Sequence, residues 1–146
     1  MHMFKSITIR QKFNQPVSDV FELMSKHATY NDAFWPVQVE RIKDAADPSR
    51  PDGLGSVRQM GFGKIKPIRE EITFLEENKL IEYQIVKNPL VKHHLGRIQF
   101  ESLSNNQTLV IYTIEFEGKL PLVGPFVLAQ LKVAVTVGLK KLAAKA

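Results

Sequence analysis

The 146-residue chain contains no cysteine. Disulfide bridges, iron–sulfur clusters, thiolate zinc sites and cysteine nucleophiles are therefore excluded. Histidines are also few, and the adjacent pair His93 and His94 is unsuited to holding one metal ion, because neighbouring side chains on a strand point to opposite faces. No other spacing of histidines resembles a metal site. We expect a protein that needs no metal and no other cofactor.

Acidic residues are absent from the C-terminal part of the chain. All 15 lie at or before Glu117, so the excess charge of +5 belongs to the lysines that follow. These are Lys119, Lys132, Lys140, Lys141 and Lys145. Five scattered lysines, with no arginine and few aromatic residues among them, are a weak indication of a nucleic-acid-binding surface. We expect no nucleic-acid partner, and lysines that favour the negative end of a C-terminal helix.

No segment has the apolar run expected of a signal peptide or a stable membrane span. Residues 4–10 alternate between apolar and polar side chains, and the most apolar stretch, 120–139, is interrupted by Pro121, Pro125 and Lys132. We predict a cytoplasmic protein without stable membrane insertion. The lysine-bearing terminal segment leaves open contact with a membrane surface or a partner. The sequence does not indicate the oligomeric state.

The composition is that of an ordinary globular protein. Apolar residues make up 44% and charged residues 24% of the chain. A chain of this length can bury one sizeable core without cross-links. We therefore expect one domain over residues 1–146.

Periodicity predicts mostly strands. Two short helices are expected early, one starting near Pro16 and one over 28–34 that ends before Trp35. Trp35 lies either in the core or at the rim of a cavity, and we favour the core. A long helix is expected over 121–144, with a length of about 36 Å. The predicted strands are 4–12, 37–43, 56–62, 68–75, 80–86, 92–103 and 108–117. This order predicts an α+β fold in which the long helix covers the apolar face of an antiparallel sheet.

Five segments carry a resemblance to a known superfamily. They are Pro16–Met24, His27–Pro36, Gly53–Arg58, Ile68–Ile72 and Leu131–Leu142. The chain resembles the START-like (SRPBCC) helix-grip superfamily, in particular its bacterial polyketide cyclase/dehydrase and lipid-transport branch. The resemblance implies a curved seven-stranded antiparallel sheet wrapped around the C-terminal helix, with two short helices between the first two strands. It also implies a cavity for lipids, hormones or aromatic polyketides, and cyclisation or dehydration in some members.

Alternation along the strands places several polar side chains on the same face as the apolar ones. Glu70 shares its face with Ile68, Ile72 and Phe74, and the other strands add further polar groups. The candidate ligand-binding residues are Arg58, Met60, Phe62, Glu70, Tyr83, His94 and Tyr112. No residue can be assigned a catalytic role from a motif.

These buried polar groups have two interpretations. They are either core residues that satisfy one another, with Arg58 and Glu70 neutralising each other across neighbouring strands, or the polar anchors of a small-molecule site. The second interpretation predicts binding of an apolar or aromatic small molecule, lipid- or polyketide-like. The alternative is a polyketide cyclase or dehydratase that uses His94 as general acid or base, assisted by Tyr112 and the Glu70–Arg58 pair.

Overall fold

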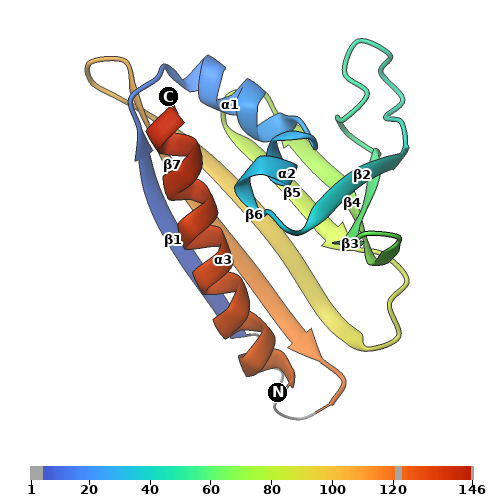
Figure 1. Ribbon diagram of the computed structural model, residues 1–146. Coiled ribbons are helices and arrows are strands. Elements are labelled where there is room, and N and C mark those ends of the chain that lie inside the picture. Colours follow the sequence, from blue (N-terminus) through green and yellow to red (C-terminus); the bar gives the residue numbers. More distant parts are fainter. Residues whose placement is uncertain (1–4, 121–122, 146) are drawn as a thin grey trace.

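A computed structural model describes residues 5–120 and 123–145 as an antiparallel sheet of seven strands and three helices (Figure 1). Along the chain the elements are β1 (Lys5–Phe13), α1 (Val17–Ser25), α2 (Thr29–Ala33), β2 (Gln38–Lys43), β3 (Val57–Phe62), β4 (Ile65–Glu76), β5 (Leu80–Ile85), β6 (Val91–Leu103), β7 (Gln107–Gly118) and α3 (Val123–Lys145). The expected order of elements is confirmed. The expected start of the last helix at Pro121 lies outside the described residues.

The strands are arranged in the order β1-β7-β6-β5-β4-β3-β2. β1 and β2 therefore form opposite edges, and the two short helices connect them across the sheet (Figure 1). The long helix α3 packs against β1, β7 and α2. A curved sheet gripping one long helix is the helix-grip architecture that the sequence predicted.

The core lies between the sheet and its helices. Residues that alternate along β6 and β7 are buried, among them Ile98, Phe100, Val110 and Tyr112. None of the described helices is long and apolar enough to span a bilayer.

A glycine in α3 sets how closely this helix approaches α2. A Cβ atom added at Gly138 would lie 2.6 Å from Cε1 of Phe34, so only glycine leaves room for this ring. Phe34 also stacks on Tyr30, with ring centroids 5.6 Å apart. The close contact brings α2 and the middle of α3 together at one side of the cavity described below.

Two expectations about side-chain placement are wrong. Trp35 is 69% exposed and therefore not in the core, whereas its neighbour Phe34 packs against Gly138 of α3. Phe74 is 43% exposed, because a shift in the pairing of β4 with β5 between Ile72 and Phe74 reverses the alternation. Leu75 packs against the core in its place. Pairing between β3 and β4 also extends β4 back to Ile65, earlier than periodicity indicated.

Candidate functional site

A cavity of about 370 Å³ lies between α3, α2 with the segment that follows it, and the strands β2 to β5 and β7. Its wall is mostly apolar and includes Phe34, Val37, Val39, Met60, Ile65, Ile68, Ile114, Leu131 and Val135. The polar groups of the wall belong to Tyr30, Arg58, Glu70, Tyr83 and Tyr112. The cavity thus combines an extensive apolar wall with a small convergent polar group, which is the usual composition of a small-molecule site.

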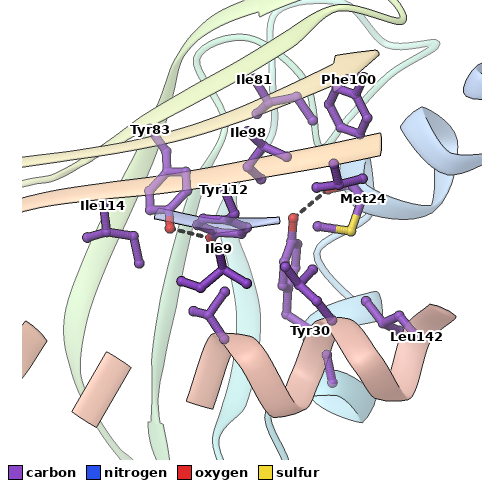
Figure 2. Packing of buried hydrophobic residues seen from close by; sticks show 14 of the residues in the cluster. Ile9, Met24, Tyr30, Ile81, Tyr83, Ile98, Phe100, Tyr112, Ile114 and Leu142 are labelled. Atoms are coloured by element: carbon purple, nitrogen blue, oxygen red, sulfur yellow. Dashed lines mark hydrogen bonds between the residues drawn. The ribbon is translucent and has the colours of Figure 1, made fainter. Parts of the chain in front are cut away.

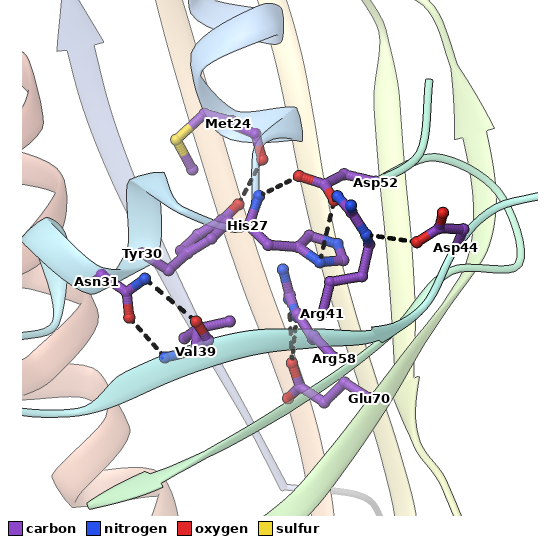
Figure 3. Close-up of polar contacts among 10 residues, drawn as sticks. All are labelled: Met24, His27, Tyr30, Asn31, Val39, Arg41, Asp44, Asp52, Arg58 and Glu70. Atoms are coloured by element: carbon purple, nitrogen blue, oxygen red, sulfur yellow. Dashed lines mark hydrogen bonds and ion pairs between the residues drawn. The ribbon is translucent and has the colours of Figure 1, made fainter. Parts of the chain in front are cut away.

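An ion pair forms the centre of the polar group. Arg58 on β3 and Glu70 on β4 are direct partners in the sheet, so their side chains leave the same face side by side. Nε and Nη2 of Arg58 lie 3.1 and 3.0 Å from Oε1 of Glu70 (Figure 3). The residues are only 4% and 6% exposed. The pairing expected from the sequence is confirmed, and it compensates two charges that burial would otherwise make very costly.

The guanidinium group of Arg58 is also held between two aromatic rings. Its central carbon lies 4.9 Å from the ring centroid of Tyr30 and 4.7 Å from that of Tyr83. Both distances suit a cation–π contact with a desolvated cation. The hydroxyl group of Tyr30 donates a hydrogen bond to the carbonyl oxygen of Met24 at 2.6 Å, which fixes the first ring. Arg58 is therefore oriented by two rings and one carboxylate.

Two tyrosine hydroxyl groups meet beside this ion pair. Tyr83 on β5 and Tyr112 on β7 are hydrogen-bonded to each other through their hydroxyl groups, across the intervening strand β6 (Figure 2). The crossing is possible because Gly96 of β6 lies directly opposite Tyr83. A Cβ atom at position 96 would lie 2.1 Å from Cζ of Tyr83, so any larger residue would displace the phenol ring.

The electrostatics of this end of the cavity are dominated by burial. Burial raises the pKa of Tyr30 to about 12 and also raises the pKa values of Tyr83 and Tyr112. Burial also raises the pKa of Glu70, although Arg58 opposes the shift. Burial would lower the pKa of Arg58, but the Glu70 carboxylate outweighs it and the net direction is upward. The tyrosines are neutral near pH 7 and the cation is retained, so the polar group carries one charge of each sign.

His94 lies behind Glu70 and outside the cavity wall. Its Nε2 is 3.9 Å from Oε2 of Glu70, and its Nδ1 accepts a hydrogen bond from the backbone N–H of Ile85 at 3.0 Å. This acceptor role places the proton of the neutral ring on Nε2. Burial, followed by the nearby His93 and Arg58, lowers the pKa of His94 to about 4. Tyr112 is paired with Ile98 in the sheet, so it does not lie opposite His94.

A second polar group, of which only His27 is buried, connects the loop after β2 to the helices. Asp52 accepts a hydrogen bond from the backbone N–H of His27 at 2.9 Å and also binds Arg41 (Figure 3). The His27 ring is buried, and Nδ1 lies 3.6 Å from Asp52, which is beyond hydrogen-bond distance. Burial, with a contribution from Arg58, lowers the pKa of His27 to about 4. These contacts hold the loop beside the cavity, and the ring of His27 is neutral near pH 7.

The edge strand β2 is held over the cavity by one asparagine. Asn31 of α2 donates from Nδ2 to the carbonyl oxygen of Val39 at 3.1 Å and accepts from the N–H of Val39 at 2.6 Å. Such a two-way contact mimics pairing with another strand. It positions Val39, the buried residue of β2, on the cavity wall.

Six of the seven candidate residues from the sequence line this cavity, and His94 does not. Sequence reasoning missed the contribution of the helices. Tyr30 gave no signal, because a five-residue helix is too short to define a face. The apolar spacing of Leu128, Leu131, Val135 and Leu142 in the last helix could have indicated its inner face. The part of the chain that the structure describes holds no group of three or more side chains suited to a metal ion.

The fold has many counterparts among solved structures. A START superfamily protein from Mycobacterium smegmatis matches with a TM-score of 0.71 and 14% identity, over 96% of this chain and 97% of that one. The Zhui aromatase/cyclase from a Streptomyces species matches with a TM-score of 0.70 and 17% identity, over 98% and 95%. The chain has the START-like helix-grip fold.

A plant enzyme shares this START-like fold as well. Norcoclaurine synthase from Thalictrum flavum, in complex with dopamine and hydroxybenzaldehyde, matches with a TM-score of 0.71 and 14% identity, over 98% of this chain and 88% of that one. No protein-family model and no curated protein matches the sequence. At these identities the structural matches establish the fold, and the site has to be judged on its own residues.

Proposed function

We propose that the protein binds an apolar or aromatic small molecule in this cavity, with the polar end of the ligand at the Arg58–Glu70 pair and the tyrosine hydroxyls. The observation that carries the proposal is a cavity of about 370 Å³ whose apolar wall ends on a compensated, buried ion pair. A purely structural ion pair would leave no open space beside it, because protein interiors are close-packed.

The size of the cavity limits the ligand. At about 30 Å³ for each water-sized group, 370 Å³ accommodates about a dozen such groups. This suits two fused aromatic rings or a medium-length acyl chain. The apolar wall would remove most of such a ligand from water, and this burial supplies the driving force for binding.

The charges predict the polarity of the ligand. Arg58 and Glu70 cancel, and the surrounding tyrosines and His94 are neutral at pH 7. An anionic ligand would add an uncompensated charge to this desolvated end, whereas a hydroxyl or carbonyl group only needs a hydrogen-bond partner. The hydroxyl groups of Tyr83 and Tyr112 can donate or accept. We therefore propose a neutral ligand with a hydroxyl or carbonyl group.

The structural neighbours support a ligand of this class without identifying it. One is described as an aromatase/cyclase, and another was determined with dopamine and hydroxybenzaldehyde bound. Dopamine and hydroxybenzaldehyde each contain an aromatic ring, and a cavity lined by tyrosines and aliphatic side chains suits such a ring.

The geometry favours binding over the cyclase or dehydratase alternative. His94 does not line the cavity, and its Nε2 faces Glu70, which does, so His94 has no direct contact with the space that a ligand would occupy. Its hydrogen bond from Ile85 also occupies the nitrogen that a base would use. We therefore propose a binding function and no chemical step.

Isothermal titration calorimetry with 2-naphthol tests the proposal. Ala134 is an exposed residue of α3 that lines the cavity, so Ala134→Trp should fill it and abolish binding. Ala129→Trp places the same side chain on an exposed position of the same helix outside the lining, and should leave binding unchanged. Equal affinity of both variants for 2-naphthol, or no binding by the wild-type protein, would contradict the proposal.

A further inference from the structure

Large apolar side chains at the mouth of the cavity are exposed to solvent. Phe62 and Ile65 line the cavity, yet they are 62% and 75% exposed. They flank the tight turn Gly63–Lys64 between β3 and β4. Exposed apolar residues are ordinary when they are scattered singly, but a cluster at the entrance of a cavity calls for an explanation.

Trp35 belongs to the same cluster. Val39 lines both the cavity and a neighbouring surface groove, and that groove is also lined by Trp35 and Lys66. The sheet pairs Gln38 with Gly61, which brings the segment after Trp35 beside the β3–β4 hairpin. Trp35 is 69% exposed, and we group it with Phe62 and Ile65 as the apolar rim of the cavity because its groove adjoins the cavity at Val39.

The net charge at this rim is positive. Lys64 and Lys66 lie in the hairpin, and no acidic residue occurs between Glu40 and Glu70 other than those of the loop at 44–52. Lys64 is exposed, and Lys66 is half-buried and donates a hydrogen bond from Nζ to the carbonyl oxygen of Gly63. Glu40 lines the groove beside Trp35, so the rim has two lysines against one acidic residue, beside three exposed apolar side chains.

We propose that this rim, formed by Trp35, Phe62, Lys64, Ile65 and Lys66, docks on the surface of a bilayer that contains anionic lipids. Lysines are attracted by the negative surface potential, while aromatic and aliphatic side chains enter the boundary between headgroups and acyl chains. A convex hairpin tip suits a deformable, flat surface, whereas an apolar protein partner would need a groove to receive it. Docking requires no ligand in the cavity, so it is independent of the function proposed above.

The chain contains a built-in reporter for this contact. Trp35 is its single tryptophan and lies in the rim. Vesicles of phosphatidylcholine and phosphatidylglycerol in equal parts should shift its fluorescence to shorter wavelength, and brominated lipid in the same vesicles should quench it. Vesicles of phosphatidylcholine alone should do neither, and added salt should reverse the shift.

Two double variants locate the docking surface. Removing two charges with Lys64→Gln and Lys66→Gln should lower the partition coefficient about 30-fold, since each lysine near an anionic surface contributes about 1 kcal/mol. Lys140→Gln with Lys141→Gln removes the same charge from the end of α3 and should change it little. Ile65→Ser should lower partitioning about tenfold. Lys64, Ile65, Lys140 and Lys141 are exposed and Lys66 is half-buried, so none of these side chains fills the core and the fold should be retained.

The proposal fails if anionic vesicles at low salt leave Trp35 fluorescence unchanged. It also fails if vesicles bind but bromine does not quench Trp35, or if the α3 double variant loses binding and the hairpin variant keeps it. That last result would place the membrane contact on the terminal helix.

Discussion

Charged side chains occur at both ends of the cavity, but they are buried at the inner end and accessible to solvent at the mouth. At the inner end, Arg58 and Glu70 are almost completely buried and compensate each other. At the mouth, Lys64 is exposed and Lys66 is half-buried, beside the exposed Phe62 and Ile65. Charges removed from water depend on their partner, whereas charges in water are screened and contribute little to stability. Substitutions at the inner end should therefore change folding, and those at the mouth should change only what the protein contacts.

The largest effect is expected when the buried ion pair is broken. Arg58→Met leaves Glu70 without its partner and should reduce the free energy of unfolding by about 3–5 kcal/mol. The double variant Arg58→Met with Glu70→Leu removes both charges and should regain most of this loss. Urea denaturation at pH 7 measures both. A loss below about 1 kcal/mol for the single variant would mean that the pair is not desolvated.

Lowering the pH should reduce the free energy of unfolding, because the buried His27 and His94 are neutral in the folded protein. Their folded-state pKa values of about 4 lie below the ordinary 6.5, so the unfolded chain binds more protons between these values. Stability is therefore complete above pH 6.5 and falls as the pH drops towards 4, by about 3 kcal/mol for each histidine. The raised pKa of Glu70 contributes with the opposite sign above pH 4.5.

The pH effect is measured as the slope of unfolding free energy against pH between 6.5 and 4.5. His94→Gln should reduce this slope by about half, whatever its effect on stability at pH 7. An unchanged slope would mean that His94 titrates normally in the folded protein.

The tyrosine pair should respond to a change on the strand between its members. Gly96→Ala places a methyl group in the phenol ring of Tyr83 and should cost about 1–3 kcal/mol as the ring is displaced. Tyr83→Phe removes only one hydroxyl group and should cost about 1 kcal/mol. If Gly96→Ala is tolerated without loss in urea denaturation, the crossing of β6 by Tyr83 is not as tight as described.

The smallest effect on stability is expected at the mouth. Lys64→Gln and Ile65→Ser should each change the free energy of unfolding by less than about 0.5 kcal/mol, because these side chains are exposed and fill no core space. Thermal unfolding followed by circular dichroism is sufficient to measure this. A large destabilisation at either position would remove the distinction between the two ends of the cavity.

The sequence predicted the architecture and most of the polar face of the sheet. Alternation was sufficient for Arg58, Glu70, Tyr83, His94 and Tyr112, because each strand keeps its inward face at these positions and all five residues are buried. It failed for Phe74, where the pairing of β4 with β5 shifts by one residue. A β-bulge leaves no mark in periodicity, since it depends on the partner strand.

The space beside these residues could not be predicted. Its wall depends on contacts between distant segments, such as Gly138 of α3 with Phe34 and Asn31 with the backbone of β2. For the same reason the sequence placed His94 in the site, whereas in the structure it faces Glu70 and does not line the cavity. Alternation along a strand predicts which side chains are buried. Whether a buried side chain reaches the cavity depends on the neighbouring side chains from other strands, which alternation does not predict.

Intermolecular nuclear Overhauser effects between 2-naphthol and the labelled protein report how the ligand is oriented in the cavity. We expect contacts from the ring edge that carries the hydroxyl group to Tyr83 and Tyr112, and from the opposite ring to Met60 and Ile65 near the mouth. Contacts in the reverse orientation, or contacts confined to residues outside the cavity wall, would contradict the claim that the buried polar group receives the polar end of the ligand.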